Sequence, residues 1–469
     1  MMQQLSAQDA QFLYIETGNN LTHVMGVNIY DPSTAPGGKV RFKDIINQVE
    51  SRFESSPVFK RRLMRLPYDF DHPYWVEDEF FDVEHHMFHG RLPQPGDWRQ
   101  FCIHLARHFS RPMDMNRPLW DMYVIEVLGR IKGIPKGSYA IATRVHHAAI
   151  DGASAMHFFS ALSDRDPQGT PALDLQPVAE ETGEPPSTVE VLNRALISNI
   201  QSPVKMASTL LRFSPAIFNT IVKSLGPDSG KGKKVPLTRF NQAVSPHKMF
   251  DATVFSLQDM KRIKDGVEGA TINDVVLAIC SGALRLYLEH HGELPDDPLV
   301  AIAPVNARSG RRDAETPGNN LSAMSVSLPT NVADALERLQ IVRDTTSQTK
   351  AAKTGISARL MTDLTRHVPA ATMAGVARLV TSGRFTSKLC NLFISNVPGP
   401  QQALYMNGAK LLHTFGMAPL ADGMGLFIAT PSYNGEMTFS IISAREIMPD
   451  IEFFRECLDA SFEELLKAL

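Results

Sequence analysis

One stretch of the chain passes from a strand into a pair of histidines and then into a helix. Residues 139–145 (Tyr-Ala-Ile-Ala-Thr-Arg-Val) are apolar and rich in strand formers, and the turn residues Pro, Lys, Gly and Ser precede them. Residues 146–152 read His-His-Ala-Ala-Ile-Asp-Gly, and residues 153–162 have the pattern of a helix. We expect a functional site at this junction, because segments that leave a sheet often carry groups that contact a ligand.

The two histidines at this junction are expected to have different tasks. Successive side chains of a strand point to opposite faces, so His147 shares a face with Val145, and His146 shares the other with Arg144. One imidazole can then face a substrate while the other packs or forms hydrogen bonds. A histidine with an ordinary pKa of about 6.5 can take a proton from a hydroxyl near neutral pH.

Asp151 and Gly152 complete the pattern. Asp151 can fold back to orient the loop or to hold an arginine, and Gly152 permits a close backbone approach that a side chain would block. A purely structural pair of histidines is the alternative. A metal site is not expected, because no Cys or His-Glu-x-x-His spacing supplies further ligands. The whole pattern, His-His-x-x-x-Asp-Gly, resembles the active-site motif of CoA-dependent acyltransferases and peptide-synthetase condensation domains.

Length, charge and cysteine content limit the class of protein. The chain has 469 residues, more than one core usually holds, so we expect two domains. A formal net charge of −3 gives no long-range attraction to nucleic acid. The N-terminus lacks a signal-peptide pattern, and no apolar run approaches the roughly 18 residues of a spanning helix. Free thiols in a reducing cytoplasm are expected from four widely spaced cysteines: Cys102, Cys280, Cys390 and Cys457.

Hydrophobic periodicity predicts helices and strands in both halves of the chain. The expected helices cover residues 6–10, 42–53, 98–109 with Asp97 as N-cap, 272–290, 332–350, 359–380 and 450–466. The expected strands cover residues 23–30, 63–76, 122–125, 139–145, 248–257, 299–303, 324–328 and 393–396, and 427–430 and 437–442 around a hairpin turn.

Two segments of unusual composition separate the halves. Residues 164–187 are rich in Pro, Gly, Asp and Glu, which is typical of an exposed linker. Residues 189–225 have a helical pattern that mixes Arg and Lys with large apolar residues, and the basic run Lys-Gly-Lys-Lys follows at 231–234. Two interpretations stay open for the 189–234 segment: packing against the domains, or contact with a lipid surface.

Polar residues also stand at element ends in the second half. Thr271, Asn273 and Asp274 begin an expected helix, where they are either helix caps or, for Asn273, a group that reaches a reacting carbonyl or CoA. The loop after the expected strand at 299–303 is either a solvated basic loop, a holder of CoA phosphates, or a partner of Asp151. Its arginines are Arg308, Arg311 and Arg312.

The chain resembles, nearly end to end, the bacterial bifunctional wax ester synthase/acyl-CoA:diacylglycerol acyltransferases. The histidine motif alone specifies only the superfamily, whereas the set of motifs together is specific to this family. The set consists of Leu5 to Ala10 (Leu-Ser-x-x-Asp), Pro118-Leu119-Trp120, His146 to Gly152, Thr271 to Ala278, Pro304 to Arg308, and Ser395-Asn396-Val397-Pro398-Gly399.

The resemblance implies an α/β fold of two chloramphenicol-acetyltransferase-like domains, each a mixed sheet flanked by helices, with a channel between them. It implies an N-terminal domain at 1–165 that carries the histidine motif, a linker and helical crossover at 166–247, and a C-terminal domain at 248–469. His147 would lie midway along the channel. Acyl-CoA and the alcohol would enter from opposite mouths.

The resemblance also implies an activity: transfer of a long-chain acyl group from acyl-CoA to a fatty alcohol and, less efficiently, to diacylglycerol, which forms wax esters or triacylglycerol as storage lipid. His147 would be the general base, with His146 in support and Asp151 holding the loop. No cofactor is expected. The protein is expected to be cytoplasmic, with peripheral contact to the inner membrane or to lipid inclusions. The residues expected at the substrate are Thr271, Asn273, Asp274, Ser395 and Asn396.

Two other classes of function stay open from the sequence. One is a condensation-type acyltransferase whose acyl donor is a carrier-protein thioester. The other is a non-catalytic protein that binds lipid droplets and would not need His147.

Overall fold

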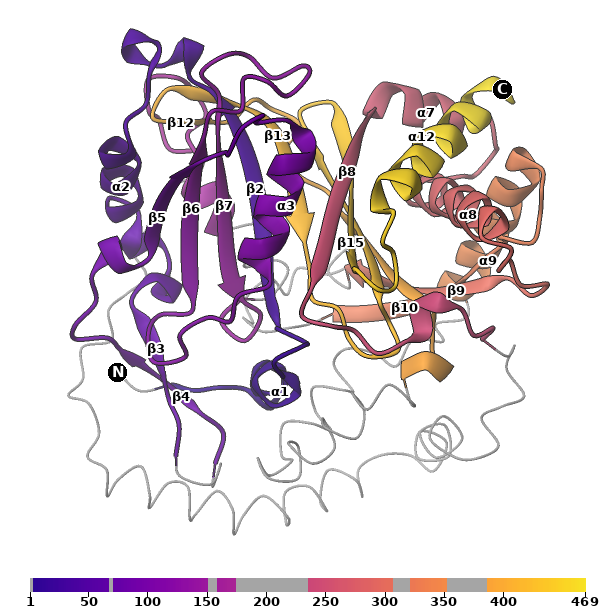
Figure 1. The fold of residues 1–469 in the computed structure, drawn as a ribbon, viewed down its shortest axis with the longest axis horizontal. Helices are drawn as coiled ribbons and strands as arrows, with labels where there is room; N and C mark the ends of the chain where they lie inside the picture. The colour runs from indigo at the N-terminus through magenta and orange to yellow at the C-terminus, as the bar shows by residue number, and fades with distance from the viewer. Residues whose placement is uncertain (1–2, 67–70, 151–157, 174–234, 307–320, 352–385) are drawn as a thin grey trace.

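Two mixed β-sheets lie side by side, with helices packed on them (Figure 1). The structure is a computed structural model, and it describes residues 3–66, 71–150, 158–173, 235–306, 321–351 and 386–469. The expectation of an α/β fold with two mixed sheets flanked by helices is confirmed.

The first sheet has six strands in the order β12-β13-β2-β7-β6-β5. Its pairs are antiparallel except β5 with β6, which is parallel. All eight residues of β7 are buried, because this strand is central and covered on both faces. The strands are β2 (His23–Asp31), β5 (Met87–Arg91), β6 (Trp120–Glu126), β7 (Tyr139–His146), β12 (Tyr405–Met406) and β13 (Ala409–Met417).

The second sheet also has six strands, in the order β10-β9-β11-β14-β15-β8. The central strand β11 is parallel to both of its neighbours, and the other pairs are antiparallel. Asn434 and Gly435 both have positive φ in the predicted hairpin turn between β14 and β15. The strands are β8 (Lys248–Ser256), β9 (Leu299–Asn306), β10 (Leu321–Leu328), β11 (Leu392–Val397), β14 (Leu426–Tyr433) and β15 (Glu436–Ala444).

One strand of the C-terminal half belongs to the first sheet. β13 pairs with β2 along nearly its whole length, with a register shift between Leu411 and His413. In Figure 1 the orange β13 accordingly reaches across to the indigo and magenta strands. The two sheets are therefore tied together by the chain itself. The predicted domain boundaries at 165 and 247 stay predictions, and the helical pattern at 189–225 lies outside the described residues.

The helices agree closely with the sequence pattern. Asp97 caps α3 by accepting a hydrogen bond from the Gln100 N–H, as predicted. One helix, α7, was not predicted, and the expected helix at 359–380 lies outside the described residues. The longer helices are α1 (Ala7–Ile15), α2 (Phe42–Glu50), α3 (Trp98–Phe109), α7 (Leu257–Asp265), α8 (Ile272–His290), α9 (Ala335–Ala351) and α12 (Ile451–Lys467).

The prediction of a single strand at 63–76 is wrong. Two short strands, β3 (Arg61–Met64) and β4 (Tyr74–Glu77), pair antiparallel within a separate three-stranded sheet that also contains β1 (Gln3–Gln4). Prolines at 67 and 73 interrupt the apolar run, and proline cannot donate a ladder hydrogen bond inside a strand.

The four cysteines are free and buried. Within the described ranges, every helix is too short or too polar to cross a membrane.

Candidate active site

The turn after β7 is held by backbone hydrogen bonds to two other segments and by one within the turn. The His146 N–H donates to the Leu119 carbonyl at 2.9 Å, and the His147 N–H donates to the Thr22 carbonyl at 2.9 Å. The Ala149 N–H closes the turn on the His146 carbonyl, also at 2.9 Å. The backbone that carries both histidines is therefore fixed by the start of β2 and by the segment before β6.

The His146 side chain is fully buried and bonded at both ring nitrogens. Its Nδ1 accepts a hydrogen bond from the Ala148 N–H at 3.1 Å, so in the neutral ring the proton is on Nε2. Nε2 then donates to Glu16 Oε2 at 2.9 Å, with the Thr22 hydroxyl oxygen 3.0 Å away. This arrangement fits a supporting role for His146, because neither ring nitrogen is left for a substrate.

Glu16 stands directly after α1 and connects that helix to the turn. Its Oε2 also accepts hydrogen bonds from the N–H and the hydroxyl of Thr22, at 3.0 and 2.7 Å. Burial by itself raises the pKa of Glu16, but the hydrogen bond and charge of His146 and the bonds from Thr22 outweigh it and lower the pKa to about 2. Glu16 is therefore a carboxylate at neutral pH and orients the His146 ring.

His147 is partly buried, and its ring lies against α1. The Phe12 ring stacks on the imidazole with 3.9 Å between ring centroids and 18° between planes. Stacking limits rotation of the imidazole, and the backbone bond to Thr22 fixes its Cα. One helix thus restrains both histidines, His147 through Phe12 and His146 through Glu16.

A buried ion pair joins β7 to the neighbouring strand β6. Arg144 donates to both carboxylate oxygens of Asp121, from Nε at 3.0 Å and from Nη2 at 2.5 Å, and its Nη1 donates to the His108 and Arg111 carbonyls. Burial raises the pKa of Asp121, and the bonds from His108 and Arg144 more than reverse this, so its pKa is well below the usual range. Arg144 is thereby committed to β6 and to the end of α3.

The predicted residues of the second half are distributed over two elements. Thr271 and Asp274 form a capping box at the start of α8, in which the Thr271 N–H and hydroxyl donate to Asp274 Oδ2 at 2.8 and 2.7 Å. The Thr346 hydroxyl donates to the other oxygen, Oδ1, at 2.7 Å. Asp274 is thus used within the fold, whereas the partly buried Asn273 lies in the first turn without such a task.

Ser395 and Asn396 lie near the end of β11, on the central strand of the second sheet. The Ser395 carbonyl accepts a hydrogen bond from the Thr430 hydroxyl at 3.2 Å. The Asn396 side-chain oxygen is buried and accepts no hydrogen bond from the described residues. Buried polar atoms are nearly always paired, so a partner for this oxygen is expected from outside the described residues.

Five predicted residues lie outside the described residues: Asp151, Gly152, Arg308, Arg311 and Arg312. In the described part of the chain, no group of three or more His, Cys, Asp or Glu side chains is arranged to hold a metal ion.

Sequence reasoning missed Glu16, Phe12 and Thr22. Glu16 is 130 positions from His146 in sequence, and no local pattern connects them. The only available signal was Ser6, which caps α1 by accepting a hydrogen bond from the Asp9 N–H and so indicates a helix there, but not what the helix contacts.

Comparisons with known proteins cover nearly the whole chain. Residues 5–276 match the wax ester synthase/diacylglycerol acyltransferase catalytic domain, and residues 317–466 match the C-terminal domain of the same family. A putative diacylglycerol O-acyltransferase of Mycobacterium tuberculosis is 32% identical, with 99% of this chain and 90% of that protein covered.

Solved structures extend the comparison. A wax ester synthase/diacylglycerol acyltransferase from Marinobacter aquaeolei VT8 is 27% identical, with a TM-score of 0.68 and 98% of each chain covered. The starter condensation domain of rhizomide synthetase is 12% identical with a TM-score of 0.54, covers 99% of this chain and 93% of its own, and shows a shared fold alone. The chain therefore belongs to the wax ester synthase/diacylglycerol acyltransferase family and is an acyltransferase.

Proposed function

We propose that the protein transfers a long-chain fatty acyl group from acyl-CoA to a fatty alcohol and, less efficiently, to diacylglycerol, with His147 as general base. The observation that carries the proposal is the contrast between the adjacent histidines. His146 is fully buried, and its ring is bonded to Glu16 and to the Ala148 N–H, whereas His147 is partly buried and its ring stacks on Phe12. The stacking and the backbone hydrogen bond to Thr22 hold the His147 imidazole in one orientation, which a general base needs.

In the proposed reaction, His147 takes the proton of the acceptor hydroxyl as its oxygen attacks the thioester carbonyl. The tetrahedral intermediate collapses with release of the CoA thiolate, and the imidazolium returns its proton to that sulfur. The new ester bond replaces the thioester bond, so no acyl-enzyme is required. Glu16, through His146, keeps the turn in place during both proton transfers.

Two amides are proposed to contact the substrates. Asn273 supplies a donor for the carbonyl oxygen that becomes negative in the intermediate. The buried side-chain oxygen of Asn396, which has no hydrogen-bond donor among the described residues, serves as an acceptor for a donor group of the substrate. Asp151 is assigned to holding the loop, and Arg308, Arg311 and Arg312 to CoA phosphates or to Asp151.

Thiol release from a long-chain acyl-CoA tests the proposal, with hexadecanol or a diacylglycerol as acceptor. Release should depend on the acceptor, be faster with hexadecanol, and fall by about 10²–10⁴-fold in His147→Ala. The matched control is His290→Ala, in a histidine that lies in the last turn of α8. A folded wild-type protein that releases no thiol with either acceptor would contradict the proposal and favour a carrier-protein donor or a binding role.

Contact with a lipid surface is a separate part of the proposal, assigned to the 189–234 segment on the basis of its basic and apolar sequence. Replacing Lys231, Lys233 and Lys234 by glutamine should weaken co-sedimentation with anionic liposomes. Unchanged co-sedimentation would remove the reason for naming these lysines.

A further inference from the structure

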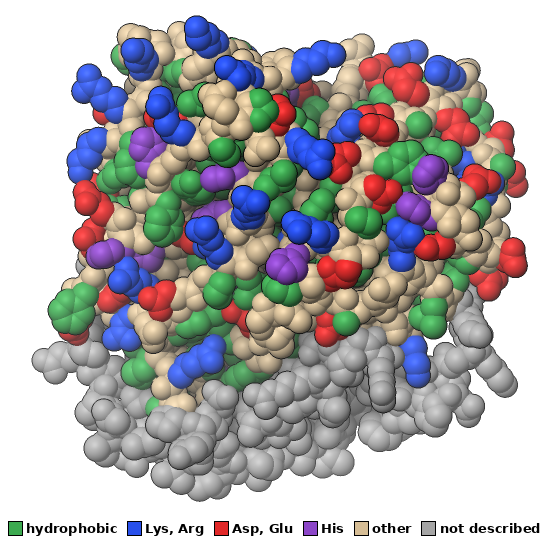
Figure 2. Space-filling model, viewed as in Figure 1, with side chains coloured by type: hydrophobic (Ala, Val, Ile, Leu, Met, Phe, Trp, Pro, Cys, Tyr) green, Lys and Arg blue, Asp and Glu red, His purple; other side chains and the backbone are tan. Residues whose placement is uncertain are grey.

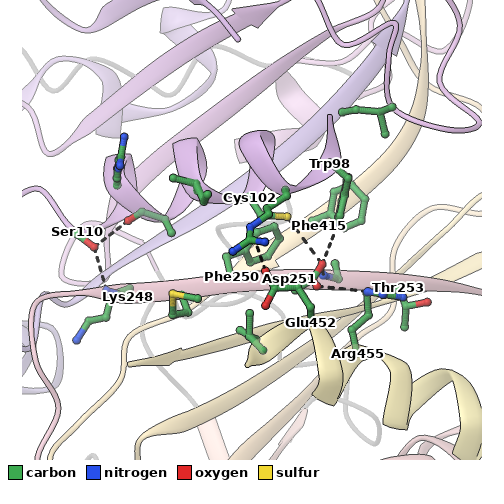
Figure 3. Close-up of a pocket in the computed structure, with 18 of the residues that line it drawn as sticks. Trp98, Cys102, Ser110, Lys248, Phe250, Asp251, Thr253, Phe415, Glu452 and Arg455 are labelled. Atoms are coloured by element: carbon green, nitrogen blue, oxygen red, sulfur yellow. Dashed lines mark hydrogen bonds and ion pairs between the residues drawn. The ribbon is translucent and has the colours of Figure 1, made fainter. Parts of the chain in front are cut away.

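A large groove is lined by α3 of the first half and by β8 and the start of α12 of the second half (Figure 3). Its volume is about 1030 Å³. Pockets for small-molecule ligands and cofactors have volumes of about 300–1,000 Å³, so the groove has room for a nucleotide-sized molecule and far more than a single ion needs.

The groove has a strong excess of positive charge. Seven Lys or Arg side chains line it, against the two carboxylates of Asp251 and Glu452. Figure 2 shows Lys and Arg side chains gathered on this face, where α3 and β8 meet. In a cleft of this kind the field of like charges is focused, which attracts an anion.

The two carboxylates are already used at one end of the groove. Asp251 accepts a hydrogen bond from Trp98 Nε1 at 2.6 Å and lies 3.3 Å from Arg455 Nε, and Glu452 lies 3.6 Å from Arg99 Nε. Figure 3 shows Trp98 and Arg455 converging on Asp251 there. Apolar side chains, among them Phe415, complete this end.

Four exposed cations of the groove lack a carboxylate partner within the described ranges: Arg107, Arg111, Lys132 and Arg445. Arg107 lies in the last turn of α3, where the helix dipole by itself favours a cation. Arg111 lies two residues beyond the same helix end, whereas Lys132 and Arg445 lie in turns, where that reason does not apply. No carboxylate among the described residues neutralises these four cations, so the groove keeps its excess of positive charge.

Arg107, Arg111 and Arg445 belong to the end of the groove at Ser110 and Lys248. The Lys248 N–H donates to Ser110 Oγ at 3.4 Å, which brings the end of α3 to the start of β8. The Arg445 N–H donates to the His247 carbonyl at 2.9 Å, which brings Arg445 to the same place. Arg107 and Arg111 at the end of α3 and Arg445 after β15 therefore lie at one end of the groove, while Trp98, Phe415, Asp251 and Glu452 lie at the other.

This cationic end shares a segment with the turn that carries His147. The buried Lys248 Nζ donates to the Asn19 carbonyl at 2.7 Å, and three residues further on the Thr22 carbonyl accepts the His147 N–H. Residues 19–22 therefore form a direct connection between the cationic end and the candidate base.

We propose that this groove binds the phosphate groups of a nucleotide-sized ligand at Arg107, Arg111 and Arg445. The identification of the ligand as the nucleotide part of CoA rests on the proposed function, whereas the phosphate chemistry does not. Arginine is suited to phosphate because its planar guanidinium donates two parallel hydrogen bonds to neighbouring oxygens.

Calorimetric titration of the full-length protein with CoA tests the inference. The variant combines Arg107→Gln, Arg111→Gln and Arg445→Gln. The control combines Arg91→Gln, Lys261→Gln and Arg262→Gln, which remove the same charge from exposed positions outside the groove. We expect the CoA dissociation constant to rise at least tenfold in the groove variant and less than twofold in the control. Equal affinity in the two variants would overturn the inference.

Two further probes distinguish the sources of phosphate. The groove variant should bind inorganic phosphate more weakly than the control variant, because the arginines that contact phosphate oxygens are gone, and it should bind vesicles of phosphatidate in phosphatidylcholine with the same affinity as the control variant. Loss of vesicle or phosphate binding with unchanged CoA affinity would overturn the nucleotide assignment and identify a lipid headgroup or free phosphate as the occupant.

Thiol release separates this inference from the proposed function. Wild-type protein that releases no thiol, while its CoA affinity still depends on the three arginines, would contradict the proposed function and support the groove. Normal thiol release, together with a CoA affinity that does not change when the three arginines are replaced, would support the proposed function and contradict the inference about the groove.

Discussion

The turn after β7 and the groove between α3 and β8 use charged side chains in opposite ways. In the turn, Asp121 is paired with Arg144, and the Glu16 carboxylate accepts hydrogen bonds from His146 and Thr22, so these charges are satisfied by the fold. In the groove, Arg111 and Arg445 are exposed and unpaired among the described residues. A buried charge must be paired because desolvation is costly, whereas exposed like charges persist cheaply and remain open to a ligand. Charge satisfaction therefore separates the scaffold of the site from the surface that we expect to bind.

The largest stability effect should come from breaking the buried pair. Asp121→Asn removes the negative charge that Arg144 needs, and we expect the free energy of unfolding to fall by about 3–5 kcal/mol in urea titrations. Asp259→Asn, in an exposed pair with Arg262, should change it by less than about 1 kcal/mol. A similar, small effect of both changes would show that the turn is no more dependent on its charges than the surface.

A smaller effect is expected from Glu16→Gln, which keeps the shape of the side chain but removes its charge. A hydrogen bond to a charged group contributes about 1.5–3 kcal/mol, so we expect a loss in that range, together with a lower kcat and a nearly constant KM. Glu16→Asp retains the charge and should recover part of kcat. A rise in KM alone would indicate that Glu16 acts on substrate binding and not on the turn.

The same carboxylate predicts a pH dependence of stability. The folded-state pKa of Glu16 is lowered to about 2 from an ordinary value of 4.5. Between these two pH values the folded protein therefore binds fewer protons than the unfolded chain. Its contribution to stability is complete above pH 4.5 and is lost as the pH falls toward 2. The difference in unfolding free energy between wild type and Glu16→Gln should shrink over this window, and a constant difference would contradict the assignment.

The smallest effect should come from the groove. Removing three unpaired cations deletes no contact with a carboxylate, so the Arg107, Arg111 and Arg445 triple variant should unfold within about 0.5 kcal/mol of wild type. Urea titration at low and high salt measures this. A loss comparable to that of Asp121→Asn would show that these arginines are structural and that the contrast between the two regions does not hold.

Local patterns predicted most elements, because caps and periodicity act over a few residues. Asp97 marks the start of α3, and Thr271 with Asp274 marks the start of α8. The prolines at 67 and 73 indicate that residues 63–76 form two strands, but the apolar composition of the run favoured the prediction of a single strand. β13 was missed because its partner β2 is almost four hundred positions away, and no local signal encodes that pairing.

The sequence by itself determined that two histidines end a buried strand, that the chain is an α/β protein, and to which family it belongs. Short-range chemistry suffices for these features, since strand and helix periodicity, capping residues and motif spacing are all local. Only the tertiary structure decided that Glu16 orients His146, that Phe12 stacks on His147, and that arginines from both halves of the chain line one groove. These contacts join residues far apart in the chain: the first two exist because α1 packs against the end of β7, and the third because α3 packs against β8 and α12 of the other half.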